Sequence, residues 1–305
     1  MRTGNEPVSG LYYEVLGESD HNRPPVLMIH GGGATGGCFR GNLAGGTGWA
    51  DRLAARGHEV WVTDWPGCGR SGGRHLIDIE YADVVDGYRH LLREVVGRPA
   101  IIVPHSMGGA TTWQLVEHEG DLVLGVVAIA ASYPGNAAPK ARILAEDGNV
   151  VRARFEETGV EFTVDLGRGY LYEDDYVYNQ AIATSTRFPR ERIEPLRAGF
   201  SGLPPKMLLQ RIGVLPGLPA VEHTTAFAGL PIRLIAGTED PAHRPAGERA
   251  TAALFRSWGA DAAVVNLGEL GLKGNGHFLF YEDNEQQVLD IVAEHIAAVM
   301  EAGAR

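Results

Sequence analysis

The chain has 305 residues, of which 44% are hydrophobic and 21% charged, and its formal net charge at pH 7 is -11. This composition is that of an ordinary globular protein and excludes a disordered, collagen-like or coiled-coil chain. The acidic balance argues against nucleic acid as a partner. No apolar run approaches the roughly 18 residues of a membrane span, and Met1–Leu16 lacks the pattern of a signal peptide, so no membrane partner is expected.

Two cysteines, Cys38 and Cys68, are too few for a disulfide framework in a chain of this length. We therefore expect a cytoplasmic protein. Its oligomeric state is not set by the sequence, and a homo-oligomer is compatible with it.

Short apolar runs alternate with amphipathic segments in two parts of the chain, residues 1–132 and 229–305. Strands are predicted at Leu11–Leu16, Val26–His30, His58–Asp64, Ala100–Pro104, Gly125–Ala131, Pro231–Ala236 and Ala262–Leu267. Helices are predicted at Trp49–Arg56, Ile79–Val96, Met107–His118, Pro245–Trp258 and Asn284–Met300. This alternation predicts an α/β fold with a parallel sheet covered by helices on both faces.

The alternation breaks down in residues 133–228, which are rich in proline and aromatic residues. A structureless loop of that length is uncommon inside a compact domain. We therefore predict that 133–228 is an inserted, mainly helical cap on a core formed by 1–132 and 229–305.

A serine stands where the strand ending at Pro104 is followed by a helix, in Pro104-His105-Ser106-Met107-Gly108-Gly109. Such a turn exposes the serine hydroxyl above the sheet and directs the N–H of Met107 to where an oxyanion would form. The alternative is that Ser106 only caps the helix. Proline stands where the G-x-S-x-G pattern has its first glycine.

A glycine loop, Gly31-Gly32-Gly33, follows an earlier strand. Backbone N–H groups of glycines can approach a ligand closely, so Gly32 is the expected second oxyanion donor, followed by Gly33. His30 is expected to be structural. The rival hypothesis is a dinucleotide site, because Gly31, Gly33 and Gly36 match G-x-G-x-x-G, but the segment after them is a poor helix.

A catalytic serine needs a base, and the base needs a carboxylate to orient it. His277 lies between glycines on a loop after the final predicted strand, and Asp240 follows the strand Pro231–Ala236. Asp240 is the stronger candidate for the acid, and Glu239 is the alternative.

Five motifs together resemble the α/β-hydrolase fold superfamily, in a serine esterase- or lipase-like form with an inserted cap. They are His30–Gly33, Asp64-Trp65-Pro66-Gly67-Cys68-Gly69-Arg70-Ser71, His105–Gly109, Gly237–Pro241 and Gly276-His277. The resemblance implies an eight-stranded, mostly parallel sheet with the site beneath the cap. It also implies Ser106 as nucleophile, Asp240 as acid and His277 as base, with an oxyanion hole from Met107 and the Gly32 region.

The predicted function is that of a serine hydrolase acting on a small to medium, largely apolar and uncharged ester or lactone. Substrate contacts are expected from Gly33, Cys38, Phe39 and Tyr133, and neither a metal nor a cofactor is expected. Amide, thioester or carbon–carbon bond hydrolysis, lyase chemistry and a non-catalytic ligand receptor are the alternatives on the same fold.

Overall fold

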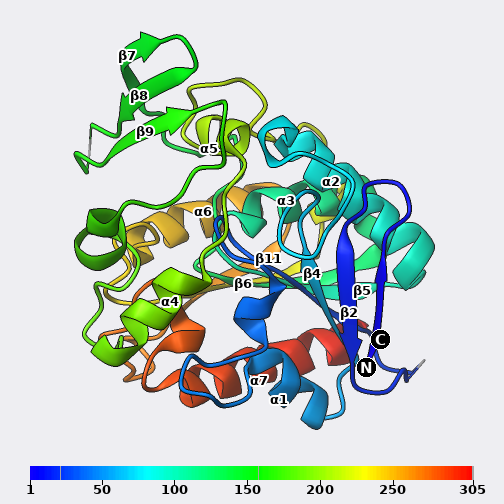
Figure 1. Ribbon diagram of the computed structural model, residues 1–305. Coiled ribbons are helices and arrows are strands. Elements are labelled where there is room, and N and C mark those ends of the chain that lie inside the picture. Colours follow the sequence, from blue (N-terminus) through cyan, green and yellow to red (C-terminus); the bar gives the residue numbers. More distant parts are fainter. Residues whose placement is uncertain (21, 157, 304–305) are drawn as a thin grey trace.

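The computed structural model describes residues 1–20, 22–156 and 158–303, and eight strands within these ranges form one sheet in the order β1-β2-β4-β3-β5-β6-β10-β11 (Figure 1). Their bounds are β1 Arg2–Asn5, β2 Tyr12–Leu16, β3 Val26–Ile29, β4 Val60–Asp64, β5 Ala100–Pro104, β6 Val123–Ile129, β10 Pro231–Ala236 and β11 Asp261–Asn266. Strand β2 is antiparallel to both of its neighbours, and every other pair is parallel. The expected mostly parallel, eight-stranded sheet is therefore confirmed.

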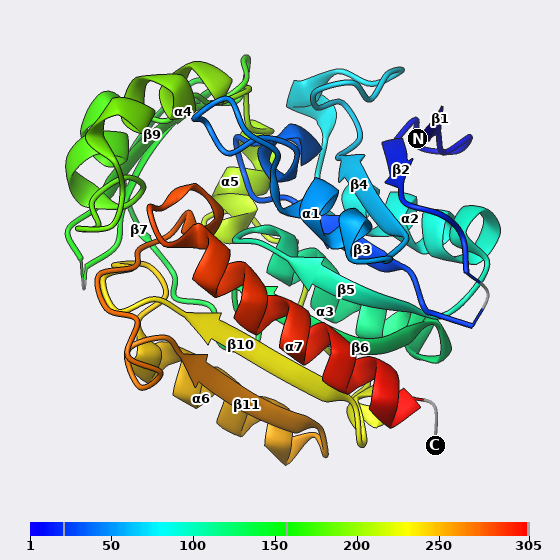
Figure 2. The ribbon, with the colours of Figure 1, turned by 90° about the horizontal axis from the view of Figure 1, so that it is seen from below.

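Helices cover both faces of this sheet, as the continuous apolar strands predict. They are α1 Trp49–Ala55, α2 Tyr81–His90, α3 Gly108–Glu119, α6 Pro245–Ser257 and α7 Glu285–Gly303. Buried side chains of α2, α3 and α6 pack on one face, and those of α1 and α7 pack on the other (Figure 2). No helix in the described ranges has both the length and the apolar character needed to cross a membrane.

Shorter helical segments connect these elements. The 3-10 turns are Gly36–Phe39, Leu76–Asp78, Gly120–Leu122, Arg190–Arg192, Thr225–Phe227 and Leu279–Tyr281. Helix α2 continues as a π-helical turn over Leu91–Val96. The predicted helix Ile79–Val96 therefore consists of an α-helix followed by a π-helical turn. It ends at Gly97, whose φ of 65° is the left-handed conformation that commonly terminates helices.

The inserted segment, residues 133–228, connects β6 to β10. It contains short helices, α4 Ile193–Gly199 and α5 Pro205–Arg211, and a π-helical turn, Tyr176–Gln180. It also contains an antiparallel sheet that the sequence analysis did not predict, made of β7 Arg142–Asp147, β8 Val150–Arg154 and β9 Glu161–Asp165. In Figure 1 these three strands stand apart from the large sheet.

The inserted segment lies over the carboxyl-terminal edge of the large sheet. The N–H of Ser201 donates to the carbonyl of Gly33 at 2.7 Å. The ring of Tyr172 packs so closely on Gly33 that a Cβ there would lie 2.7 Å from it. Loops at the carboxyl ends of parallel strands are the usual place for ligands in such folds.

Candidate active site

Ser106 occupies a strained turn between β5 and α3. Its φ is 49°, in the left-handed region that non-glycine residues rarely adopt. The turn brings the start of α3 against β3, since a Cβ at Gly108 would lie 2.7 Å from the His30 carbonyl oxygen. Only glycine fits at such a distance from backbone. The Ser106 side chain is left partly exposed above the sheet.

Pro104 fits this turn without loss of a ladder bond. The pairing of β5 with β6 shifts its register between Ala100 and Ile101, extends to Ile102 and resumes at an isolated bridge between His105 and Ile129. The interruption falls at the proline, which has no N–H to donate. On the other side, the N–H of His105 donates to the Ile29 carbonyl at 2.9 Å.

The close contact at Gly108 gives a first prediction. Gly108→Ala is expected to lower the free energy of unfolding by about 2–3 kcal/mol, because the new methyl group meets backbone that cannot move aside. Chemical denaturation followed by circular dichroism measures the loss. Gly199→Ala is the matched control, since a Cβ at Gly199, at the end of α4, meets nothing within 4 Å. Equal stability of the two variants would contradict the packing argument.

The side chains of Ser106, His277 and Asp240 form one chain of hydrogen bonds. His277 Nε2 lies 3.0 Å from Ser106 Oγ, and its Nδ1 lies 2.8 Å from Asp240 Oδ2. His277 is 6% exposed and Asp240 is 2% exposed. Ser106 follows β5, Asp240 follows β10 and His277 follows β11. These three strands all end at the same edge of the sheet. This is the geometry of a nucleophile, a base and an orienting acid.

The surroundings of Asp240 keep it ionised. Burial acts to raise its pKa, but the charge and hydrogen bond of His277, with His243 and the N–H of Ala242, hold that pKa well below the usual range. The N–H groups of Ala242 and His243 both donate to Oδ1, at 2.8 and 3.1 Å. Oδ2 is thereby left to the imidazole of His277.

Glu239, the alternative acid, points elsewhere. Its side chain is exposed and accepts hydrogen bonds from the N–H and hydroxyl of Thr186, at 2.7 and 3.1 Å. Of the two neighbouring acids, the structure therefore brings only Asp240 to the imidazole of His277.

The loop that carries His277 is held by two residues that the sequence analysis did not select. Glu282 is fully buried and accepts from the N–H of Gly276 at 2.6 Å and from the hydroxyl of Ser185 at 2.5 Å. His105 Nε2 lies 3.0 Å from the carbonyl oxygen of His277. Burial lowers the pKa of His105 well below its usual value, so this imidazole is a neutral donor to that carbonyl.

Gly32 and Met107 lie against each other beside Ser106. A Cβ at Gly32 would overlap the sulfur of Met107, so a larger residue there would displace the Met107 side chain. Among the described residues, the backbone N–H of neither Gly32 nor Met107 donates to a protein acceptor. Two unpaired N–H groups beside a nucleophile are available to an oxygen of a ligand.

The sequence and the fold are both similar to those of known proteins. The sequence model of the alpha/beta hydrolase family matches residues 26–291. The chain belongs to this family. It is also 23% identical over 349 aligned positions to "Probable secreted lipase phiG" of Fungal sp. (strain ATCC 74256), covering 92% of this chain and 84% of the relative.

Solved structures of other enzymes share the fold. A thermophilic esterase from Thermogutta terrifontis has a TM-score of 0.59 at 16% identity, covering 95% of this chain and 94% of that one. A haloalkane dehalogenase from Bradyrhizobium elkani has a TM-score of 0.64 at 20% identity, covering 99% and 98%. Est816, described as an N-acyl homoserine lactone degrading enzyme, has a TM-score of 0.60 at 20% identity, covering 93% and 96%.

The residues predicted to contact substrate in this α/β hydrolase differ in their surroundings. Gly33 lies under Tyr172, and Tyr133 is half-buried with its ring 5.4 Å from that of His243. Phe39 is fully buried and packs against Phe280 at 5.3 Å, as a core side chain does. Cys38 is 8% exposed, and burial raises the pKa of its thiol.

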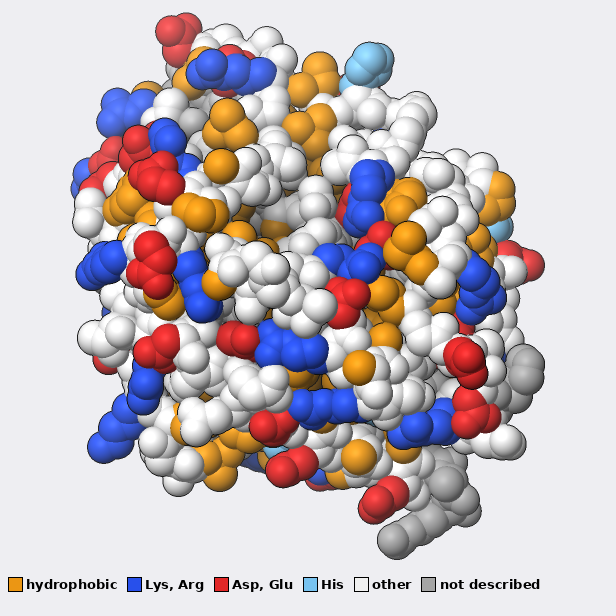
Figure 3. Space-filling model, turned by 60° about the horizontal axis from the view of Figure 1, so that its bottom comes forward, with side chains coloured by type: hydrophobic (Ala, Val, Ile, Leu, Met, Phe, Trp, Pro, Cys, Tyr) orange, Lys and Arg blue, Asp and Glu red, His pale blue; other side chains and the backbone are white. Residues whose placement is uncertain are grey.

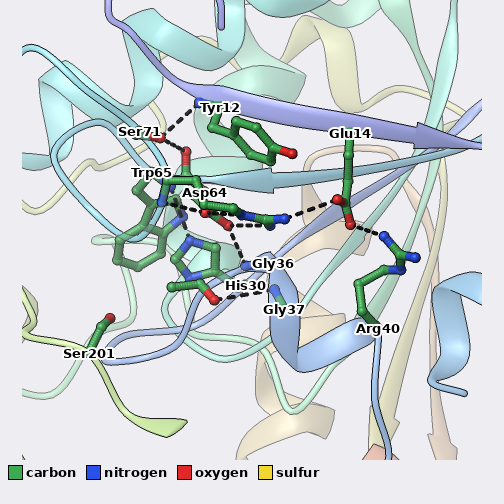
Figure 4. Close-up of polar contacts among 12 residues, drawn as sticks. Tyr12, Glu14, His30, Gly36, Gly37, Arg40, Asp64, Trp65, Ser71 and Ser201 are labelled. Carbon is green, nitrogen blue, oxygen red and sulfur yellow. Dashed lines mark hydrogen bonds and ion pairs between the residues drawn. The ribbon is translucent and has the colours of Figure 1, made fainter. Parts of the chain in front are cut away.

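The Asp64 loop of this α/β hydrolase fastens the glycine loop to the sheet (Figure 4). Asp64 is fully buried, and its carboxylate accepts from the N–H of Gly36 at 2.8 Å and from Arg70 Nε at 2.9 Å. Arg70 also bonds Glu14, which contacts Arg40. Burial acts to raise the pKa of Asp64, but the hydrogen bonds and charge of Arg70 lower it.

His30 has the structural role that the sequence predicts for it. Its Nδ1 contacts the Gly31 carbonyl at 2.7 Å and its Nε2 accepts from the N–H of Trp65 at 3.1 Å. Burial lowers the pKa of His30 to about 4, so the ring is neutral near pH 7 and can accept this bond.

A second prediction follows from the pair of Asp64 and Arg70. Arg70→Met is expected to lower the free energy of unfolding by about 2 kcal/mol, because it leaves a buried carboxylate without its cation. The loss of unfolding free energy should be largest well above pH 4, where Asp64 is ionised in both the folded and the unfolded protein. It should shrink as the pH falls and the carboxylate of the variant takes up a proton.

Urea denaturation at several pH values measures this loss. Arg74→Met is the control, since Arg74 pairs with Asp83 at the surface, where ion pairs contribute little. A loss no larger in Arg70→Met than in Arg74→Met would contradict the prediction.

Proposed function

We propose that this α/β hydrolase is a serine hydrolase that cleaves a carboxylic ester or lactone of a small to medium, largely apolar substrate. The observation that carries the proposal is the continuous chain of hydrogen bonds from Ser106 through His277 to Asp240, at 3.0 and 2.8 Å. The names of the fungal lipase and of the esterase and lactone-degrading structures give it further support.

The proposed reaction passes through an acyl-enzyme. His277 Nε2 accepts the proton of Ser106 as Oγ attacks the carbonyl carbon, and Asp240 stabilises the imidazolium. The proton then passes to the departing alkoxide oxygen as the ester bond breaks. Water attacks the acyl-enzyme with His277 as base again, which releases the acid and restores Ser106.

The N–H groups of Gly32 and Met107 are the proposed oxyanion donors. Each such donor contributes about 3 kcal/mol to stabilisation of the transition state in related chemistry. Because both N–H groups lack protein acceptors in the described structure, no hydrogen bond within the protein has to break before they bind the developing charge.

Aromatic side chains next to the site favour an apolar substrate. The rings of Tyr172 and Tyr176 stack with their centroids 5.2 Å apart. The ring centroid of Phe200 lies 5.5 Å from that of Tyr172 and 5.9 Å from that of Phe278. Tyr172, Tyr176 and Phe200 come from the inserted segment, which we propose acts as a cap that sets substrate choice. Residues from both sides of a cap boundary commonly line such pockets.

Hydrolysis of p-nitrophenyl acetate, butyrate and octanoate tests the proposed function. The wild-type protein should turn over at least one of them and should be inactivated by an aryl fluorophosphonate that labels one serine. The preferred chain length measures the size of the pocket. Absence of turnover together with absence of labelling would refute a serine hydrolase and favour a lyase or a ligand receptor.

We also propose that the protein acts in the cytoplasm on a small molecule. Cys38 and Cys68 are both buried and unpaired in the structure, as suits a reducing compartment. The fungal relative, in contrast, is named as secreted. Cell fractionation would distinguish the two locations.

A further inference from the structure

Arg211 brings a positive charge next to the candidate nucleophile. It is the last residue of α5 in the inserted segment and is partly exposed. Its Nε donates to the hydroxyl of Ser132 at 3.0 Å, and the N–H of Ser132 donates to the Ser106 carbonyl at 2.8 Å. A single residue, Ser132, therefore connects the guanidinium to the backbone of Ser106.

This charge has no counter-ion among the residues that the structure describes. Within the described ranges Arg211 forms no ion pair, and its two terminal nitrogens donate to no protein acceptor, whereas Lys206 on the same helix pairs with Glu80 at 3.3 Å. The acidic groups deep in the site already have partners, since Asp240 bonds His277 and Glu248 bonds His243. A guanidinium has five donors, and here only the Nε donor is used.

The residue before Arg211 in α5, Gln210, accepts a hydrogen bond at 3.0 Å from the backbone N–H of a tyrosine whose hydroxyl is buried. Tyr81, at the start of α2, is fully buried, and its hydroxyl has no hydrogen-bond partner in the described protein. Burial raises the pKa of Tyr81 and that of Tyr172. The charge of Arg211 acts to lower both of these pKa values. The hydroxyl of Tyr172 lies close to Gly32, in the proposed oxyanion loop, since a Cβ added at Gly32 would be 3.1 Å from it.

Unsatisfied donors of this kind call for an anionic acceptor. Buried polar groups are nearly always hydrogen-bonded, and the described residues supply no partner for the Tyr81 hydroxyl, so this hydroxyl is available to a ligand. Guanidinium groups bind carboxylates through two parallel hydrogen bonds, which adds orientation to charge attraction. On the face of the molecule drawn in Figure 3, in contrast, acidic and basic side chains are interspersed, without a field of one sign.

We propose that Arg211 and Tyr81 bind a carboxylate carried by the substrate, so that the preferred substrate is an ester or lactone with a second, ionised carboxyl group. This inference rests on the proposed function and narrows its substrate class. It differs from the uncharged substrate that the sequence predicts. The rest of such a substrate would contact the aromatic side chains of the inserted segment.

Two pairs of matched esters test the proposal, one for each side of the scissile bond. The first pair is mono(p-nitrophenyl) adipate and its counterpart with a carboxamide in place of the carboxylate. The second is p-carboxyphenyl butyrate and p-carbamoylphenyl butyrate. In each pair the carboxamide has the shape of the carboxylate without its charge, so the ratio of the two kcat/KM values isolates recognition of charge.

The wild-type protein should prefer the carboxylate of at least one pair by about tenfold or more. Arg211→Met should reduce this ratio to near one, chiefly through KM, and Arg211→Lys should retain part of it. Tyr81→Phe should lower the ratio with little change of fold. Lys206→Met, which removes a charge from the same helix, should keep the wild-type ratio.

The outcomes separate this proposal from the proposed function. Two results would overturn the role of Arg211 and leave the proposed hydrolase function intact. One is that the wild-type protein hydrolyses the esters of each pair with a kcat/KM ratio near one. The other is a kcat/KM ratio that Arg211→Met leaves unchanged. Failure of the wild-type protein to hydrolyse any of the four esters or the p-nitrophenyl esters would overturn both.

Discussion

Ser106→Ala is expected to lower kcat/KM for p-nitrophenyl butyrate by roughly 10⁴-fold or more. The hydroxyl of Ser106 is the one bonded to His277, at 3.0 Å, and no acyl-enzyme can form without it. Residual turnover from the unpaired N–H groups of Gly32 and Met107 would be small. Steady-state kinetics measures the loss, and labelling by an aryl fluorophosphonate should disappear with it.

Two further variants make this result specific. His277→Ala should cause a loss of similar size, and the double variant should lose little more, since the two side chains act as one unit. Ser257→Ala, an exposed serine at the end of α6, is the control and should retain wild-type kinetics. Full activity of Ser106→Ala would remove Ser106 from the nucleophile role.

The central part of the fold could be predicted because its strands are buried on both faces. Strands β5 and β10 have the predicted bounds, and β3 and β4 differ from them by one or two residues. A continuous apolar run has only a few stable structures available, so its pattern is informative. Strand β1 was missed because Arg2–Asn5 is a polar, mostly exposed edge strand without such a run.

The sheet β7–β9 of the inserted segment was also missed, although a local signal was present. Gly148-Asn149 lies between β7 and β8, and Gly148 has a φ of 57°, as a two-residue hairpin turn with glycine at its first position requires. Most of β7 is exposed, so its sequence lacks the apolar alternation of a half-buried strand. The sequence analysis predicted a mainly helical cap here only because the strand–helix alternation breaks down and a structureless loop of this length is uncommon.

The candidate site shows the same division between local and tertiary information. Ser106, Asp240 and His277 each follow a strand, and their order along the chain is enough to bring them into one hypothesis. Glu282 and Arg211 carry no such signal. Their partners are 97 and 79 residues away in sequence, and only the tertiary fold brings them together.

The largest effect outside the nucleophile and the base is expected at the acid. Asp240→Asn should lower kcat for the same ester by about 10⁴-fold, because the amide would hold His277 in the wrong tautomer. The N–H groups of Ala242 and His243 would bind the amide oxygen, as they bind Oδ1 of the wild-type carboxylate. The amide nitrogen would then face His277 Nδ1.

An imidazole that accepts a hydrogen bond at Nδ1 carries its own proton on Nε2. In that form it can donate to Ser106 but cannot remove the serine proton, so the base function is lost although the residue keeps its place. Glu239→Gln is the matched comparison, because Glu239 bonds Thr186 and does not contact His277. It should change kcat less than about threefold, as expected for an exposed side chain. Equal and modest losses in the two variants would show that neither carboxylate orients the base.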